Sequence, residues 1–141
     1  MRLLHYPPQE QAQEPGSFGA YPHTDYGVIT VLAQDPSGGL ELQKKDGSWI
    51  AAPYVPGTFV INIGDLMARW TNGLFQSNKH QVVNRTGKER FSIPFFFNPD
   101  HRAVVECIPT CNQLDNPDAY PPVMAGEYIA NKIRTNQGFK D

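Results

Sequence analysis

Short apolar runs follow one another along most of the chain, and turn-forming residues separate them. The runs are rich in β-branched and aromatic residues, and the segments between them contain Gly, Pro, Asn and Asp, which is typical of strands joined by tight turns. The pattern predicts strands over residues 2–6, 28–33, 40–44, 49–54, 58–63, 80–84, 91–97 and 103–108. About eight short strands without a long helical period between them predict a mainly β fold, a jelly roll or double-stranded β-helix.

Three stretches depart from this pattern. Residues 9–19 are polar and without a period, so we expect a loop there. Residues 66–70 predict a short helical turn. In the tail over residues 123–134, Ile129 and Ile133 are four positions apart and Tyr128 is adjacent, which predicts one amphipathic C-terminal helix on the outside of the fold.

Composition limits the classes of partner. The chain has 141 residues, of which 40% are hydrophobic and 18% charged, with a net charge of −2 and a pI near 6.0. This length suits one domain over residues 1–141, and the charge favours neither nucleic acid nor a membrane surface as a partner. Without an apolar stretch of about 20 residues or a signal-like start, we expect a cytoplasmic protein. Cys107 and Cys111 lack a second pair of ligands, which favours reduced thiols over a zinc site.

The segment YPHTDYG contains the first candidate chemistry. His23 and Asp25 are separated by one residue, so in an extended backbone both side chains project from one face. With His80 at the start of a later strand, they would supply two imidazoles and one carboxylate, the ligand set of non-haem Fe(II) oxygenases. By itself the pattern fits a hydrogen-bonded histidine at a strand boundary about as well.

The segment RFSIPFFF contains the second candidate. Arg90 and Ser92 share a strand face, and a guanidinium buried in such an apolar stretch needs an anionic partner. A small-molecule carboxylate fits both side chains. The alternative is an internal salt bridge to Asp65, Glu89 or Asp100.

Together these motifs resemble the Fe(II)- and 2-oxoglutarate-dependent oxygenases, in the branch that includes isopenicillin N synthase and the plant dioxygenases. The similarity extends over most of the chain, through HTDYGVITVLAQD, GGLEL, DGSWI, PGTFVINIGD, WTNGLFQSNKHQVVN, RFSIPFFFNPD and YPPVMAGEYI.

The resemblance implies roles for individual residues. It implies that His23, Asp25 and His80 bind Fe(II). It also implies that Arg90 and Ser92 bind the distal carboxylate of 2-oxoglutarate. Two further side chains follow from it: Tyr6, which precedes Pro7, as a hydrogen-bond partner of the cosubstrate, and Phe96 as a lining residue of the substrate pocket.

The sequence departs from the family pattern in places. Gln81 follows the distal histidine where the family commonly has arginine, and Leu74 stands where a basic residue is frequent. Leu4 stands where the plant members have asparagine. We also expect that the family's N-terminal region is missing ahead of this domain.

The implied reaction couples oxidative decarboxylation of 2-oxoglutarate, with Fe(II), O₂ and ascorbate as a supporting reductant, to oxidation of a small organic substrate. Hydroxylation, desaturation and cyclisation remain open. Two alternatives also remain: an isopenicillin N synthase-like oxidase that does not use 2-oxoglutarate, and an inactive jelly-roll fragment.

Overall fold

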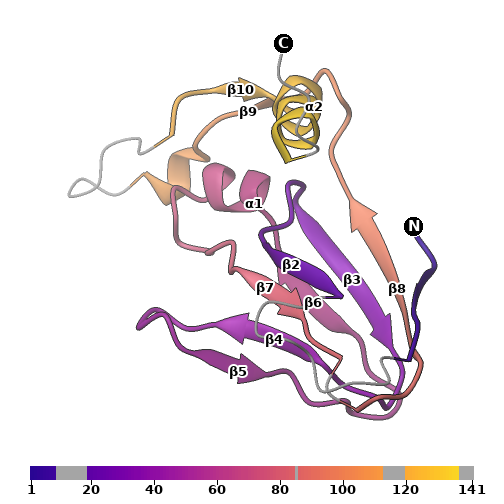
Figure 1. Cartoon of the computed structure of the whole chain (residues 1–141). Helices are drawn as coiled ribbons and strands as arrows, with labels where there is room; N and C mark the ends of the chain where they lie inside the picture. The colour runs from indigo at the N-terminus through magenta and orange to yellow at the C-terminus, as the bar shows by residue number, and fades with distance from the viewer. Residues whose placement is uncertain (9–18, 85, 113–119, 137–141) are drawn as a thin grey trace. The chain divides into compact units, whose positions relative to one another are not determined.

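The computed structural model describes residues 1–8, 19–84, 86–112 and 120–136 (Figure 1). The strands are β1 Leu4–Tyr6, β2 Ala20–His23, β3 Ile29–Gln34, β4 Leu40–Gln43, β5 Trp49–Ala51, β6 Val60–Ile63, β7 His80–Val82, β8 Arg90–Phe97, β9 Val104–Val105 and β10 Val123–Met124. The helices are α1 Asp65–Trp70 and α2 Ala125–Asn136, with a 3₁₀ turn at Pro109–Cys111. The predicted mainly β fold with a C-terminal helix is confirmed.

Each predicted strand has a counterpart, and most counterparts are shorter than the apolar run. The run over 49–54, for example, is a strand only over Trp49–Ala51. Its end is set by pairing, because β5 is paired with β4 from Glu41↔Ala51 to Gln43↔Trp49. The helical turn predicted at 66–70 is α1, and the helix predicted within 123–134 is α2. The predicted loop lies, apart from Gly19, outside the described residues.

Strands β2 and β10 were not predicted. Strand β2 contains Pro22, and a proline within a short run argues against a strand because it cannot donate to the ladder. The structure accommodates Pro22 because β2 lies at the edge of the sheet β2-β7-β4-β5 and its register with β7 shifts between Ala20 and His23. His23 therefore ends a strand. Strand β10 has two residues, too few to show a period.

The strands form three antiparallel arrangements. One sheet has the order β1-β8-β3-β6, the second β2-β7-β4-β5, and β10 pairs with β9 alone. By its internal contacts the chain divides into two compact units. Unit 1 comprises Met1–Thr24, Val31–Ile61 and Asn78–Phe95, and unit 2 comprises Asp25–Thr30, Asn62–Ser77 and Phe96–Asp141.

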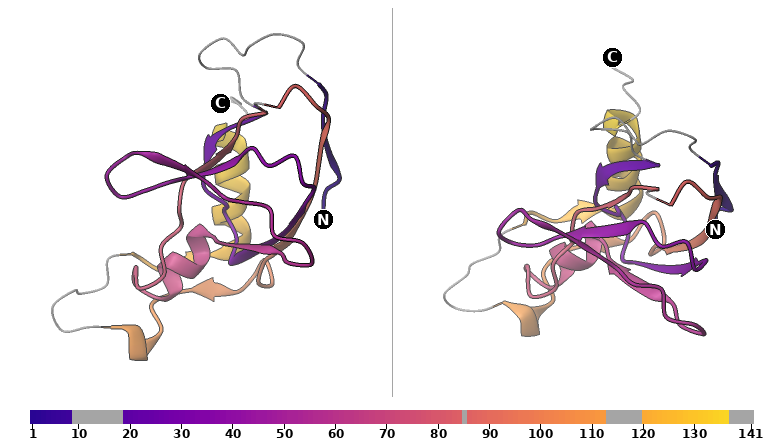
Figure 2. Two further views of the ribbon diagram at one scale, coloured as in Figure 1. Left: turned by 90° about the horizontal axis from the view of Figure 1, so that it is seen from below. Right: turned by 60° about the horizontal axis from the view of Figure 1, so that its bottom comes forward.

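Unit 1 has a small apolar core of Leu32, Leu40 and Val82, which come from three different strands. Partly buried side chains around them are Tyr6, Ala20, Ala52 and Val60. Strands β4 and β5 run side by side as a hairpin (Figures 1 and 2). Its turn uses Gly47 at φ 86°, a backbone angle that glycine adopts without steric cost.

Unit 2 is built around α1 and α2. Its buried core consists of Val28, Leu66, Val105 and Ala125. Tyr128 and Ile129 of α2 pack against this core as predicted, whereas Ile133 is 41% exposed. Within the described part of the chain, neither helix is both long and apolar enough to span a membrane.

Strand β8 has an unusual distribution of buried side chains. Arg90, Ser92 and Pro94 are buried, whereas the alternate residues Phe91, Ile93 and Phe95 are exposed. A charged side chain thus occupies the inner face while aromatic side chains occupy the outer face. Because burying a guanidinium is costly without compensation, this inversion marks the inner face of β8 as a candidate binding surface.

Candidate metal and cosubstrate site

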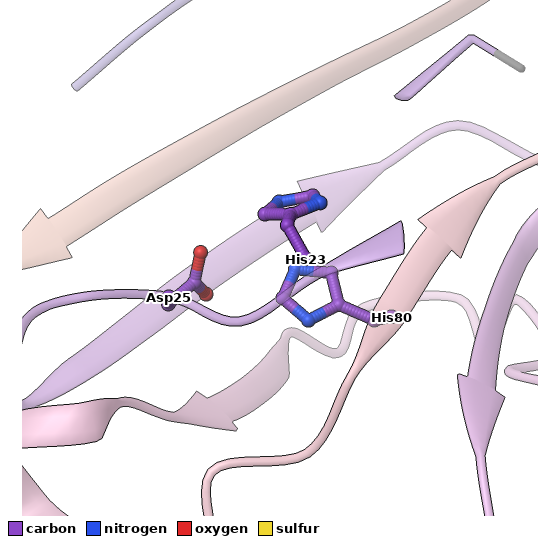
Figure 3. Close-up of side chains that lie close together, drawn as sticks. All are labelled: His23, Asp25 and His80. Carbon is purple, nitrogen blue, oxygen red and sulfur yellow. The ribbon is translucent and has the colours of Figure 1, made fainter. Parts of the chain in front are cut away.

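His23, Asp25 and His80 lie together (Figure 3). One potential ligand atom from each of them lies within 4.8 Å of the other two. Asp25 and His80 are 7% and 6% exposed, and His23 is half-buried. Among the described residues they form the one group of this kind. The structure therefore brings together the three side chains that the sequence selected, and their donor set is that of a 2-His-1-carboxylate site.

The two imidazoles are held in the same tautomer. Nδ1 of His23 lies 2.7 Å from the carbonyl oxygen of Tyr21, and Nδ1 of His80 lies 3.2 Å from that of Asn78. A carbonyl oxygen only accepts, so in each neutral ring Nδ1 carries the proton and Nε2 carries the lone pair. Histidine ligands in metal sites commonly have such a second hydrogen bond, which fixes the ring for coordination through the other nitrogen. The side chains therefore fit a bound metal ion.

The start of α1 holds the backbone around Asp25. The N–H groups of Asp65 and Leu66 donate to the carbonyl oxygens of Asp25 and Gly27 at 2.8 and 3.0 Å. Gly64, the residue before the helix, packs so closely that a Cβ there would lie 2.2 Å from the oxygen of Gly27. The Gly-Asp pair of INIGD therefore ends β6 and also positions the segment that carries the carboxylate.

Asn62 was not predicted to contact the candidate ligands. Its side-chain amide donates to Oδ2 of Asp25 at 3.5 Å, a long hydrogen bond. Asn62 lies 37 residues further along the chain, so spacing in the sequence could not have indicated this contact.

Arg90 is fully buried, and the hydrogen bonds that it makes in the described part of the chain go to uncharged acceptors. Nε donates to the carbonyl oxygen of Gly38 at 2.6 Å, one terminal nitrogen donates to Oγ of Ser92 at 3.1 Å, and the other donates to Oε1 of Gln34 at 3.4 Å. In the described part of the chain, none of the acidic residues proposed as an internal partner pairs with it. Asp65 pairs with Lys132, Glu89 with His5 and Asp100 with Arg102.

Tyr6 lies beside the arginine. It is the cross-strand partner of Arg90 in the antiparallel pair of β1 and β8, and its ring centroid lies 4.8 Å from the guanidinium carbon. This is the distance of a cation–π contact. The structure thus brings Tyr6, Arg90 and Ser92 together. Phe96, the remaining sequence candidate, is 36% exposed near the end of β8.

Two of the departures from the family pattern, Gln81 and Leu74, lie in different surroundings. Gln81 is buried, and its amide donates to the carboxylate of Glu41, its cross-strand partner, at 2.6 Å. A neutral amide therefore stands where an arginine would form an ion pair, on the strand face opposite to that of His80. Leu74 is 55% exposed.

The chain matches the model of the 2OG-Fe(II) oxygenase superfamily over residues 1–99. It is 42% identical, over 98% of its length and 40% of the relative's, to the 2-oxoglutarate-Fe(II) type oxidoreductase hxnY of Emericella nidulans. The chain therefore belongs to the 2OG-Fe(II) oxygenase superfamily. The predicted family is confirmed, together with Fe(II), 2-oxoglutarate and O₂ as its cofactors.

Solved structures give the same result for the fold. A full-length Neurospora crassa protein in complex with alpha-KG and thymine matches with a TM-score of 0.89 and 36% identity, over 95% of this chain and 43% of that one. JOX2 in complex with 2OG, Fe and JA matches with a TM-score of 0.82 and 31% identity, over 92% and 38%. These matches confirm the jelly-roll fold. The chain spans about 40% of the length of the curated relatives it matches.

Proposed function

We propose that this chain carries the iron and cosubstrate sites of a non-haem oxygenase, in which His23, Asp25 and His80 bind Fe(II). The supporting observation is the convergence of their ligand atoms within 4.8 Å, together with the tautomer that leaves the Nε2 lone pair of each histidine for the metal. Three protein ligands leave coordination positions open for the cosubstrate and O₂.

Arg90 and Ser92 bind the distal carboxylate of 2-oxoglutarate in this proposal. Arg90 is a buried cation whose hydrogen-bond partners within the described ranges are neutral, so an anionic ligand would compensate its charge. A carboxylate accepts two parallel N–H bonds from a guanidinium, and the hydroxyl of Ser92 can add a third. Tyr6, stacked beside Arg90, completes this end of the cosubstrate site.

The reaction is the oxidation of a small organic molecule. With Fe(II) and 2-oxoglutarate bound, the site would supply oxidative decarboxylation of 2-oxoglutarate by O₂, coupled to oxidation of a substrate C–H bond. In this proposal the two histidines and Asp25 hold the metal, and Arg90 and Ser92 bind the cosubstrate. Phe96 lines the substrate pocket. The similar solved structures contain unlike small molecules, thymine in the Neurospora crassa protein and JA in JOX2, which supports the class of substrate and not one compound.

We further propose that residues 1–141 act together as one jelly-roll domain, since similar proteins align over nearly the whole chain. The family match and the relatives named as 2-oxoglutarate-dependent support use of 2-oxoglutarate over an oxidase mechanism without it.

Anaerobic titration tests the proposal. The Fe(II)-loaded chain, mixed with 2-oxoglutarate in the absence of O₂, should develop a weak visible charge-transfer band. After addition of O₂ it should convert 2-oxoglutarate to succinate. Iron binding without the band would favour the oxidase alternative, and failure to bind iron would contradict the ligand assignment.

A further inference from the structure

The N–H groups of Arg90 that are not used by the described residues determine which ligand group the guanidinium can bind. A guanidinium has five N–H groups, one on Nε and two on each terminal nitrogen. The bonds to Gly38, Ser92 and Gln34 use the Nε donor and one donor of each terminal nitrogen. Counting the described residues alone, one N–H remains on each terminal nitrogen, and two N–H groups are what one bidentate carboxylate accepts.

Gln34 accepts a hydrogen bond from Arg90 with an uncharged amide, and the lack of charge is the property that matters for anion binding. It ends β3, and its amide oxygen accepts from the terminal nitrogen of Arg90 that does not bind Ser92. Glutamate has nearly the same size and would accept the same hydrogen bond. It would also neutralise the guanidinium, and the buried charge would no longer favour an incoming anion.

Among the residues that the structure describes, no carboxylate forms a salt bridge with Arg90. Asp35 follows Gln34 directly, but its two carboxylate oxygens accept backbone N–H groups, from Phe91 at 2.5 Å and from Ser37 at 2.9 Å. These two backbone hydrogen bonds fix the position of the Asp35 carboxylate. Gly38 contributes only a carbonyl oxygen.

We propose that Gln34 is a positioning residue, which orients the guanidinium of Arg90 with an uncharged acceptor and keeps its charge available to one ligand carboxylate. The inference rests on the proposed function, in which that ligand is 2-oxoglutarate, and adds a determinant of its binding. The neutral amide contributes little affinity itself. Its role is to avoid an internal salt bridge that would compete with the cosubstrate.

The test compares binding of 2-oxoglutarate with binding of 2-oxobutyrate, which has the same keto acid group but no distal carboxylate. Both are titrated by calorimetry into the chain loaded with Mn(II). For Gln34→Glu we expect the affinity for 2-oxoglutarate to fall about tenfold or more, because the introduced carboxylate occupies Arg90. Affinity for 2-oxobutyrate and Mn(II) should stay unchanged. The midpoint of thermal unfolding should stay the same or rise, since Arg90 gains an ionic partner.

Two variants complete the experiment. Gln34→Met keeps the length of the side chain without its acceptor, and we expect a several-fold loss of 2-oxoglutarate affinity with unchanged 2-oxobutyrate affinity. Gln76→Glu adds the same charge at an exposed position and should bind both acids like the parent chain. A parent chain that binds the two acids equally would refute the carboxylate role of Arg90. A parent chain that prefers 2-oxoglutarate, with both Gln34 variants unchanged in that preference, would refute the role of Gln34 alone.

Discussion

His23 and His80 are cross-strand partners in the antiparallel pair of β2 and β7, and their ring centroids lie 4.3 Å apart. The register of the two strands therefore sets the distance between the two imidazoles, although the histidines are 57 positions apart in the sequence (80 minus 23). On the other side of β7, His80 is paired with Leu42, which has no side-chain donor or acceptor. The pairing thus places His80 between His23 on one neighbouring strand and Leu42 on the other.

Replacing His80 by alanine should remove metal binding and retain the fold. We expect the affinity for Fe(II) or Co(II) to fall about a hundredfold or more, because loss of a ligand exceeds the usual effect of losing a supporting residue. Calorimetric metal titration measures this, and circular dichroism checks the fold. His101→Ala is the control, because that side chain is 77% exposed. Equal metal affinity in the two variants would contradict the assignment of His80.

Replacing Arg90 by lysine should weaken the binding of 2-oxoglutarate. An ammonium keeps the charge but cannot reproduce the planar fork, nor the bonds to Gly38 and Gln34 together. We expect the KM for 2-oxoglutarate to rise about ten- to a hundredfold. Arg102→Lys, at an exposed residue beside Asp100, serves as the matched substitution. If the KM for 2-oxoglutarate stayed at the parent value, Arg90 would not bind the cosubstrate.

Gly64→Ala should destabilise the chain and weaken metal binding together. The new Cβ would lie 2.2 Å from the carbonyl oxygen of Gly27, so the segment that carries Asp25 must move. We expect a loss of about 1–3 kcal/mol in the free energy of unfolding, measured by urea denaturation. Gly57→Asn is the control, because a Cβ there meets nothing within 4 Å and asparagine tolerates the φ of 74°. A Gly64→Ala chain as stable as this control would show that the close approach to Gly27 is not required.

We expect the carboxylate of Asp35 to make a pH-dependent contribution to the free energy of unfolding. Burial by itself raises the pKa of Asp35. Hydrogen bonds from the backbone N–H groups of Phe91 and Ser37, the Ser37 hydroxyl and the positive charge of Arg90 together outweigh it, and the pKa lies below its ordinary value of 3.8. A carboxylate with a depressed folded-state pKa stabilises the fold above the unfolded-state pKa, and the contribution disappears as the pH falls through the folded-state pKa.

Asp35→Asn should therefore destabilise the chain near neutral pH by on the order of 1 kcal/mol, because its amide cannot accept both N–H groups through two oxygens. The difference from the parent chain should shrink below pH 3.8 and vanish at lower pH. Urea denaturation at a series of pH values measures it. A difference that does not change with pH would mean that the charge of Asp35 is not involved.

The sequence predicted the strands with clear alternation and the two helices because those patterns are local. It did not predict β2, where Pro22 argues against a strand and the edge position of β2, with its shifted register, makes the proline acceptable. The phenylalanines of β8 show a similar limit. The alternation of RFSIPFFF indicates two faces, but only the structure shows that Arg90 occupies the buried face and Phe91 the exposed one.

The sequence by itself determined which chemical groups are present: the spacing of His23 and Asp25, the later His80, and the Arg90–Ser92 pair identified the family and its candidate ligands. Only the tertiary structure decided how those groups are supported. The contact of Asn62 with Asp25, the approach of Gly64 to Gly27, and the neutral acceptors Gly38 and Gln34 around Arg90 all depend on contacts between distant segments. Hydrogen bonds act over a few ångströms in space and not along the sequence, so strand register selected these partners where residue spacing could not.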